Sequence, residues 1–292
     1  MKYSYFPGCS LKGTGRAYEE SLLPVFRALG VELAEIPDWN CCGATAYMSS
    51  DELAAFALGA RNLALAERAK TGDVLAPCSA CYLNLSKTQH YIEEYADTGR
   101  KVKAGLRAIG LSYVGSLKVR HPLDVVVNDI GLDAVRKLVK KPLKGLTVAP
   151  SYGCQIVRPY ATFDDQREPV TLDQLLVALG AEVVPFGLKT RCCGGSLTGT
   201  LEPVGVPLAH RILIEARDKG ADLITTVCPL CQFNLDGYQG AAVVGEGEVA
   251  VPVTYFTQLM GLAFGLPAEA TVINRGIVPA QPILSQRSLL SV

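Results

Sequence analysis

Hydrophobic and polar residues alternate along this chain in short blocks, some with the period of a strand and some with the period of a helix. Short apolar runs bounded by Gly, Pro or Asp predict strands, and apolar residues spaced three and four apart predict amphipathic helices. The predicted strands cover residues 3–6, 31–36, 73–76, 146–150, 182–184 and 222–227. The predicted helices cover residues 18–29, 51–70, 170–179 and 206–219. This alternation predicts an α/β fold with a largely parallel sheet.

The same order of elements occurs twice, which indicates an internal duplication. Residues 28–30 and 178–180 both read Ala-Leu-Gly, 150 positions apart. Cys81 and Cys231 are separated by the same interval, and an Asn-Leu pair begins three residues after each of them. We therefore expect two similar domains related by a pseudo-twofold axis.

The boundary between these domains is expected near residue 145, which gives an N-terminal domain of residues 1–144 and a C-terminal domain of residues 145–292. Residues 121–141 are predicted to form a helix that links the two. Each domain would have its own strand–helix alternation, so the ligand sites are expected in loops at the carboxyl ends of parallel strands.

Composition narrows the possible partners. The chain has 28 Lys and Arg residues against 28 Asp and Glu residues, and 49% of its residues are hydrophobic. A neutral chain without a basic run is not expected to bind nucleic acid or an anionic membrane. No apolar run is long enough to span a bilayer, and the first residues lack the features of a signal peptide. We therefore expect a cytoplasmic protein without a membrane span.

Ten cysteines form two copies of one five-cysteine pattern. The first copy contains Cys9, Cys41, Cys42, Cys78 and Cys81, and the second contains Cys154, Cys192, Cys193, Cys228 and Cys231. Each copy consists of a single cysteine, a vicinal pair and a CxxC motif, in that order. In the first copy 31 residues lie between the single cysteine and the pair and 35 between the pair and the CxxC motif; in the second copy these numbers are 37 and 34. Cytosolic thiols are normally reduced, so this matched order indicates metal–sulfur sites rather than structural disulfides.

Five cysteines in each copy exceed the four ligands of a structural zinc ion or of a cubane [4Fe–4S] cluster. The side chains of adjacent cysteines point in different directions, which favours neighbouring irons of a larger or opened cluster over one tetrahedral ion. Four alternatives stay open: a four-thiolate site with a spectator cysteine, structural zinc, a thiol redox centre without metal, and a vicinal disulfide.

These motifs resemble the cysteine-rich CCG domain family, and over essentially its full length the chain is similar to the B subunit of heterodisulfide reductase, a family that includes a bacterial sulfur-oxidising branch. The motifs that carry the resemblance are Phe-Pro-Gly-Cys-Ser at 6–10, Cys-Cys-Gly at 41–43, Pro-Cys-Ser-Ala-Cys at 77–81, Tyr-Gly-Cys at 152–154 with Arg-Pro at 158–159, Cys-Cys-Gly-Gly at 192–195, and Cys-Pro-Leu-Cys at 228–231.

The resemblance implies that each five-cysteine set binds one noncubane [4Fe–4S] cluster. It also implies that the two clusters flank a disulfide and cleave it in one-electron steps, or act in the opposite direction on a thiol or persulfide. Electrons would then pass through a ferredoxin-like protein and a flavoprotein, which resemble the C and A subunits of the same family of complexes. The alternative function is that of a non-catalytic electron-transfer CCG subunit in another dehydrogenase complex.

Four further residues are candidates for the catalytic site: Lys12, His121, Arg158 and Arg191. The three cations stand close to cysteines in the sequence and would hold an anionic substrate or offset cluster charge. Otherwise they are ordinary charges facing solvent. His121 would relay a proton, or would cap or pack a helix.

Other segments have two interpretations each. Asn84 and Asn234 would donate a hydrogen bond to cluster sulfur or lie on a helix surface. Trp39 would form a wall of the site or part of the core. Residues 255–264 form a helical stretch that fits a core or a partner-facing position, and residues 274–292 would form a docking arm or a frayed end.

Overall fold

Two four-stranded sheets, each wholly parallel, form the centre of the protein in this computed structural model, which describes residues 1–44, 47–241 and 250–290. The first sheet has the order β2 (Glu32–Glu35), β1 (Lys2–Tyr5), β3 (Val74–Leu75), β4 (Val119–Arg120). The second has the order β6 (Glu182–Val183), β5 (Thr147–Ser151), β7 (Leu223–Thr226), β8 (Val253–Tyr255). The matching orders confirm the predicted duplicated α/β fold.

Helices surround both sheets. Those of the first half are α1 (Gly8–Leu11), α2 (Arg16–Ala28), α3 (Tyr47–Ser50), α4 (Glu52–Ala69), α5 (Ser79–Glu94) and α6 (Ala96–Ala108). The connecting segment contains α7 (Pro122–Asp124), the π-helix η1 (Val125–Ile130) and α8 (Leu132–Leu138). The second half contains α9 (Thr171–Ala178), α10 (Leu197–Thr200), α11 (Glu202–Asp218), α12 (Pro229–Gly237), α13 (Phe256–Ala263), α14 (Ala268–Thr271), the 3₁₀-helix η2 (Ile273–Arg275) and α15 (Gln281–Gln286).

Local chemistry explains where the longest helix begins and ends. The Asp51 carboxylate accepts a hydrogen bond from the backbone N–H of Ala54 at 2.9 Å and so caps the start of α4. At the other end, Lys70 takes a left-handed conformation that satisfies the last carbonyls. The helix predicted over residues 51–70 is therefore confirmed.

The connecting segment differs from the single helix predicted over residues 121–141. It starts as the short helix α7, widens into η1, and breaks at Gly131, whose φ is +85°. A residue with a Cβ rarely adopts this conformation, so the glycine ends one helical segment and α8 begins directly after it. The prediction of one continuous helix was wrong for this reason.

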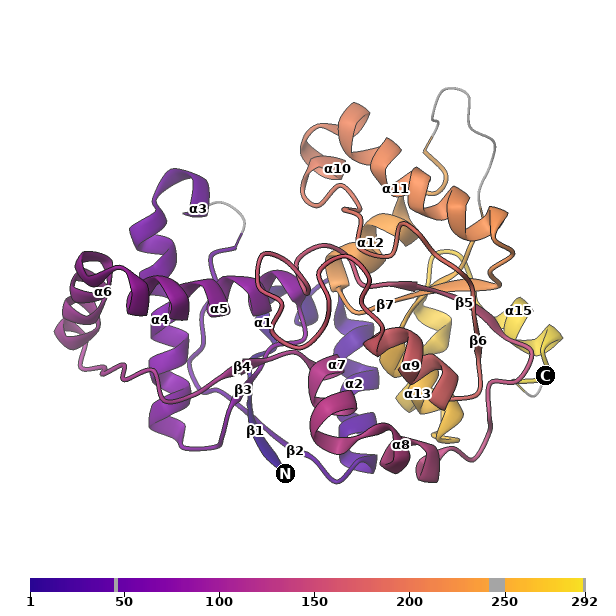
Figure 1. Cartoon of the computed structure of the whole chain (residues 1–292), viewed down its shortest axis with the longest axis horizontal. Helices are drawn as coiled ribbons and strands as arrows, with labels where there is room; N and C mark the ends of the chain where they lie inside the picture. The colour runs from indigo at the N-terminus through magenta and orange to yellow at the C-terminus, as the bar shows by residue number, and fades with distance from the viewer. Residues whose placement is uncertain (45–46, 242–249, 291–292) are drawn as a thin grey trace.

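Helix–helix contacts join the two halves. Helix α2 of the first half packs against α13 of the second, and α9 of the second half packs against α7 and α8 (Figure 1). The rings of Tyr18 and Tyr255 stack at 4.5 Å in the first of these contacts. Beside them, the hydroxyls of Ser21 and Thr257 lie 2.7 Å apart. One hydrophobic cluster contains residues of both halves, so a division at residue 145 would cut a shared core.

The C-terminal segment packs on the second half as far as the structure describes it. The backbone N–H groups of Ile277 and Val278 donate to the Asp236 carboxylate at 2.7 and 3.0 Å. Leu284 and Leu289 are buried. Of the tail predicted over residues 274–292, only the last two residues lie outside the described part. Within the described ranges, no helix has both the length and the apolar character needed to cross a bilayer.

Candidate functional site

The cysteines lie where the central strands of each sheet end. Cys9 lies in α1, which follows β1, and Cys154 comes three residues after β5. Cys78 and Cys228 are the N-cap residues of α5 and α12, which follow β3 and β7. Neighbouring parallel strands end at one edge of a sheet, so these loops gather the cysteines of each half.

Burial divides each set of five cysteines in the same way. The second cysteine of each vicinal pair and both cysteines of each CxxC motif are buried. The remaining thiols are more accessible: Cys9, Cys41 and Cys192 are exposed, and Cys154 is partly exposed. All ten thiols are free, so neither vicinal pair forms a disulfide. Each half thus has three buried thiols, which form the floor of the site, and two thiols at its edge that are accessible to solvent.

Two glycines leave room beside the buried thiols. Gly8 and Gly153 precede the first cysteine of each set and both have a φ of +68°. A Cβ at Gly8 would lie 2.9 Å from Cys81 Sγ, and a Cβ at Gly153 would lie 2.9 Å from Cys231 Sγ. Such a contact is shorter than real Cβ atoms show, so any other residue would displace the sulfur. The two halves therefore keep the same space free next to corresponding thiols.

A cavity of about 230 Å³ lies among the cysteines of the second half. All five of these cysteines line it, together with Ser79 and Ala80 from the CxxC loop of the first half. A wall made of thiols suits the soft ligand preference of iron–sulfur clusters. Within the described ranges, no three Cys, His, Asp or Glu side chains converge as they would around one metal ion. The five thiols in the lining suit the cavity to a cluster, and its walls come from both halves.

Hydrogen bonds among the thiols favour the thiolate at one sulfur of a pair and the neutral thiol at the other. The hydrogen bond from Cys41 lowers the pKa of Cys42 to about 4, and Cys81 Sγ lies 3.3 Å from Cys42 Sγ. In the second half, the hydrogen bond from Cys154 lowers the pKa of Cys192 to about 6. The same hydrogen bonds raise the pKa of Cys41 and Cys154. The thiolate is the form that binds metal, so Cys42 and Cys192 are in the charge state that a metal ligand needs at neutral pH.

The two cysteine sites touch each other. Hydrogen bonds from Cys231 and, across the boundary between the halves, from Cys78 hold the pKa of Cys228 well below its usual value. Helices α1 and α12 are in contact beside this point. Gly15 lies so close to Pro229 that an added Cβ would come within 2.7 Å of the proline Cβ. The close approach places the two sites side by side.

Two asparagines at equivalent positions hold the vicinal pairs. The amide of Asn84 donates a hydrogen bond to the carbonyl of Cys42. The amide of Asn234 donates to the carbonyl of Cys193 at 3.2 Å and lies 3.4 Å from its Sγ. Both asparagines are buried, so they do not lie on a helix surface as one interpretation of the sequence held.

His121 connects the two CxxC loops. Its Nδ1 accepts a hydrogen bond from the N–H of Leu123 at 3.2 Å, which places the proton on Nε2. Nε2 lies 3.0 Å from the carbonyl of Pro77 and 3.3 Å from that of Val227, the residues that precede Cys78 and Cys228. Burial lowers the pKa of His121 to about 4, so the ring is neutral at pH 7. It caps α7 and bridges the two halves at once.

The predicted cations lie in different surroundings. The Lys12 ammonium pairs with Glu19 at 2.8 Å and Glu35 at 3.0 Å. The Arg158 guanidinium donates a hydrogen bond to the carbonyl of Thr190, and its charge contributes to the low pKa of Cys192. Arg158 is therefore brought to the cysteines, whereas the charge of Lys12 is engaged by carboxylates.

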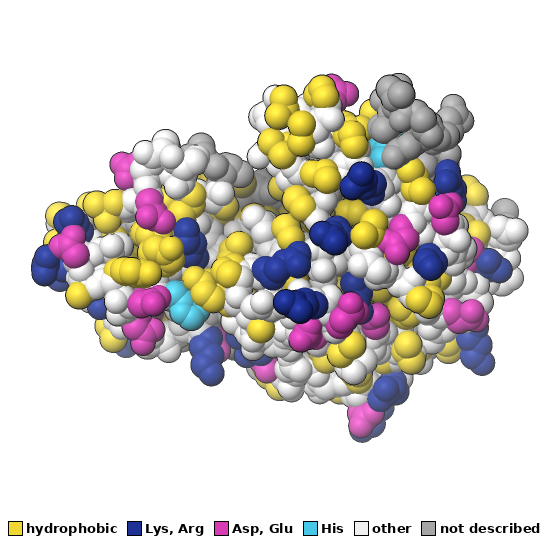
Figure 2. All heavy atoms as spheres, turned by 45° about the horizontal axis from the view of Figure 1, so that its top comes forward, with side chains coloured by type: hydrophobic (Ala, Val, Ile, Leu, Met, Phe, Trp, Pro, Cys, Tyr) yellow, Lys and Arg dark blue, Asp and Glu magenta, His cyan; other side chains and the backbone are white. Residues whose placement is uncertain are grey.

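Two other candidates lie at the surface or its margin. The Arg191 side chain is exposed next to Cys192. The half-buried Trp39 meets Phe6 edge to face at 5.6 Å and donates from Nε1 to Glu35 at 2.9 Å. On the face drawn in Figure 2, Lys and Arg side chains gather near the middle, interspersed with Asp and Glu.

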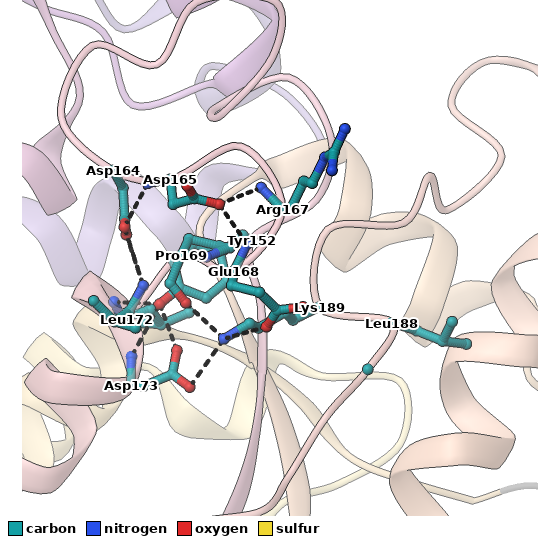
Figure 3. A network of polar contacts seen from close by, with 12 residues as sticks. Tyr152, Asp164, Asp165, Arg167, Glu168, Pro169, Leu172, Asp173, Leu188 and Lys189 are labelled. Atoms are coloured by element: carbon teal, nitrogen blue, oxygen red, sulfur yellow. Dashed lines mark hydrogen bonds and ion pairs between the residues drawn. The ribbon is translucent and has the colours of Figure 1, made fainter.

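One buried cation was missed by the sequence analysis. Lys189 donates from Nζ to the carbonyl of Pro169 at 2.6 Å and lies 3.5 Å from the Asp173 carboxylate (Figure 3). Its carbonyl accepts from the N–H groups of Tyr152 and Gly153 at 2.8 and 3.2 Å. Lys189 thereby fixes the loop that carries Cys154. Its position three residues before Cys192 was the one available signal, and most lysines so placed are ordinary surface charges.

Comparison with known proteins gives a consistent result. The CCG cysteine-rich domain matches residues 3–86 and again residues 148–236. The membrane anchor subunit of 8-methylmenaquinol:fumarate reductase from Wolinella succinogenes is 34% identical over 96% of this chain and 98% of its own length. A protein from Archaeoglobus profundus, named as similar to the B subunit of heterodisulfide reductase, is 33% identical over 92% of each chain. The B subunit of a CoB-CoM heterodisulfide reductase from Methanosarcina acetivorans is 28% identical over 95% of this chain and 94% of its own.

The fold also occurs in a solved structure. A hypothetical protein from Helicobacter pylori superposes with a TM-score of 0.75 at 13% identity, over 94% of this chain and 51% of that protein. At this identity the likeness concerns the fold alone. The two domain matches and the relatives at 33–34% identity establish the family. This chain belongs to the cysteine-rich CCG domain family, whose domain it contains twice.

Proposed function

We propose that this chain is the disulfide-handling iron–sulfur subunit of a complex resembling heterodisulfide reductase. The observation that carries the proposal is the pairing of two complete five-thiol sites, which meet at Cys78 and Cys228 and each expose two thiols. A protein that only conducts electrons has no need of two open sites facing one another. The homologues named after the B subunit of heterodisulfide reductase support the same activity.

In this proposal each set of five cysteines holds one noncubane [4Fe–4S] cluster. When bound, the two clusters would exchange electrons singly, which together matches the two electrons of one disulfide. The buried thiols form the floor, Gly8 and Gly153 keep its space free, and the asparagines fix the vicinal pairs. Arg158 supplies positive charge beside Cys192, where it would attract an anionic disulfide, thiol or persulfide.

The partners follow from the relatives named as heterodisulfide reductase subunits. The proposed complex contains a ferredoxin-like protein, similar to the C subunit of such complexes, which exchanges electrons with this chain. A flavoprotein similar to the A subunit supplies the two-electron chemistry. We place this complex in the cytoplasm. The direction of electron flow depends on the potentials of these partners, because for a two-electron couple about 30 mV corresponds to roughly 1.4 kcal/mol.

One relative favours a second candidate function. The Wolinella protein is named as a subunit of 8-methylmenaquinol:fumarate reductase, and 96% of this chain aligns with it. By analogy, this chain would be a non-catalytic electron-transfer subunit of another reductase or dehydrogenase complex. It would then contain iron–sulfur clusters that do not respond to a disulfide.

Anaerobically purified chain distinguishes these functions. We expect about eight irons per chain if each cluster contains four, with an equal amount of labile sulfide. Addition of CoB-CoM heterodisulfide or cystine to the reduced protein should change the electron paramagnetic resonance spectrum. Clusters whose spectrum is indifferent to every disulfide would favour the electron-transfer function. Folded protein without iron would exclude both.

The ligand assignment predicts that each half loses its cluster independently. Cys193→Ala should remove about half of the bound iron, and Cys42→Ala should remove the other half, because each buried thiol belongs to one set. The spectra that remain in the two variants should add up to that of the unmodified chain. If either variant keeps all of its iron and both spectra, the assignment is wrong.

A further inference from the structure

A second cavity, outside the cysteine sites, lies along the edge strand β4. Its volume is about 690 Å³. Its walls come from α5, from β4, from the connecting segment, and from a loop of the second half that includes Phe163. We name it the β4 groove and define it by Tyr82, Ser86, Gln89, Val119, Asp124 and Phe163. The function proposed above makes no use of it.

The second half contains a counterpart of this groove, because the duplication repeats its walls. Tyr82 and Ser86 correspond to Gln232 and Asp236 at the 150-residue interval, and Gln89 corresponds to Gln239. The hydrogen bonds correspond as well. Gln89 Nε2 donates to the carbonyl of Leu117 at 2.6 Å, and Gln239 Nε2 donates to that of Val251 at 2.7 Å. Both carbonyls lie just before the edge strand of their sheet.

The counterpart in the second half is filled by the chain itself. Residues 273–280 lie along it, and the Asp236 carboxylate accepts hydrogen bonds from the N–H groups of Ile277 and Val278 at 2.7 and 3.0 Å. The space that remains is about 40 Å³. One surface of this architecture thus binds a peptide segment that begins as the 3₁₀-helix η2 and continues without regular structure, and the corresponding space is open in the other half.

The loop that carries Thr162 and Phe163 borders the β4 groove, and no described segment of this chain fills the space that remains. After α8 the chain turns toward the second half, where the N–H groups of Lys140 and Lys141 both donate to the carbonyl of Ala263 at 2.9 Å. It then continues into β5. The segment that would correspond to residues 273–280 is therefore used as the connection between the halves.

We propose that the β4 groove binds an acidic segment of a partner subunit, in the way that its counterpart binds residues 273–280. Within the described ranges, the Lys103 and Lys118 side chains at the groove form no ion pair, whereas the Arg120 guanidinium is engaged by Asp124 and Asp129. Besides Asp124, the carboxylate in the described lining is Glu93. The lining as described thus holds the cations Lys103, Lys118 and Arg120 against the carboxylates Glu93 and Asp124, and this excess of positive charge favours carboxylates on the segment that docks.

The groove also lies next to the first cysteine site. Tyr82 follows Cys81 directly, and its ring meets His121 edge to face at 5.8 Å. A partner anchored here would therefore lie beside the thiols of the first half. The inference rests on the proposed function insofar as it takes that partner to be an electron-carrying subunit of the same complex.

The test compares charge reversal inside and outside the groove. The tagged complex is purified from its native host with the unmodified chain, with Lys103→Glu/Lys118→Glu, and with Lys137→Glu/Lys144→Glu. Lys137 and Lys144 lie outside the groove, so both double variants change the net charge equally. We expect the amount of one subunit that co-purifies with the groove variant to fall at least about tenfold, whereas the control variant retains that subunit in full. Iron content should be equal in all three, which separates a failure of docking from a failure of the proposed function.

A photo-reactive phenylalanine analogue identifies the occupant. Val114 lines the groove and its side chain is exposed, whereas Ile109 is exposed outside it. The analogue at position 114 should cross-link to an acidic segment of the subunit that the charge reversal releases, and the analogue at position 109 should not. The proposal is overturned if both double variants retain every subunit. It is also overturned if position 114 cross-links only to a second copy of this chain, or to no protein because the groove holds a small molecule.

Discussion

Replacing Gly153 by Ala is expected to abolish cluster binding in the second half while the first half keeps its own cluster. The added methyl group would lie 2.9 Å from Cys231 Sγ, so this sulfur must move out of the ligand set. Gly8→Ala should have the mirror effect, since its Cβ would lie 2.9 Å from Cys81 Sγ. Each variant should therefore retain about half of the iron, because each site is expected to bind four atoms.

Both substitutions also force Ala into a left-handed conformation, which alone costs roughly 1–2 kcal/mol. Gly30 and Gly220 provide matched controls, because their φ angles are +72° and +74° and nothing lies within 4 Å of an added Cβ. Gly30→Ala and Gly220→Ala should be destabilised to a similar degree yet keep all of their iron. Iron analysis and visible absorption of the four variants measure the difference. Equal iron in all four variants would show that the sulfurs of Cys81 and Cys231 are not cluster ligands.

The parts of the fold that the sequence predicted are those that depend on neighbouring residues. Apolar periodicity identified the helices that became α2, α4, α9 and α11, because each helix buries one face of its own. The strands β1 and β5 were predicted on the same basis. Because parallel strands end at a common edge of their sheet, the predicted strands also implied that the cysteines of each half lie close together. The short edge strands β4 and β8 were not predicted. Strands this short give no period of their own, and the two-residue strands β3 and β6 were found only as parts of the longer segments 73–76 and 182–184.

The remaining features depend on contacts between distant residues. The hydroxyls of Ser21 and Thr257 are 236 positions apart in the sequence, so no local pattern indicates that α2 packs on α13. The same holds for His121, whose contact with the carbonyl of Val227 spans 106 positions. The sequence showed a histidine before a proline at the start of a helix. It offered no sign that the same ring reaches both cysteine loops.

His121→Ala is expected to destabilise the protein and to alter both clusters together. The substitution removes the donor shared by the carbonyls of Pro77 and Val227, as well as the cap on the N–H of Leu123. A buried polar group left without a partner costs about 1–3 kcal/mol, so a loss of about 3–5 kcal/mol in the free energy of unfolding follows. Both CxxC loops begin at these carbonyls. A change in the paramagnetic spectra of both clusters would therefore accompany the lower stability, whereas a purely structural role would lower stability and leave the spectra unchanged.

His121→Gln is the informative partner variant, because its amide keeps one donor near the Nε2 position but does not titrate. Burial lowers the pKa of His121 in the folded protein to about 4, against about 6.5 when unfolded. Asp124 and Cys228 are the charged groups that face the ring. As the pH falls below about 6.5, His121 binds a proton in the unfolded chain but stays neutral in the folded chain. The free energy of unfolding of the wild type therefore declines by up to about 1.4 kcal/mol per pH unit. Anaerobic urea unfolding at pH 7 and pH 5 should therefore show a loss about 2 kcal/mol larger in the wild type than in His121→Gln. Equal losses would mean that His121 is charged or exposed in the folded protein, and the bridge between the two cysteine loops would then be incorrect.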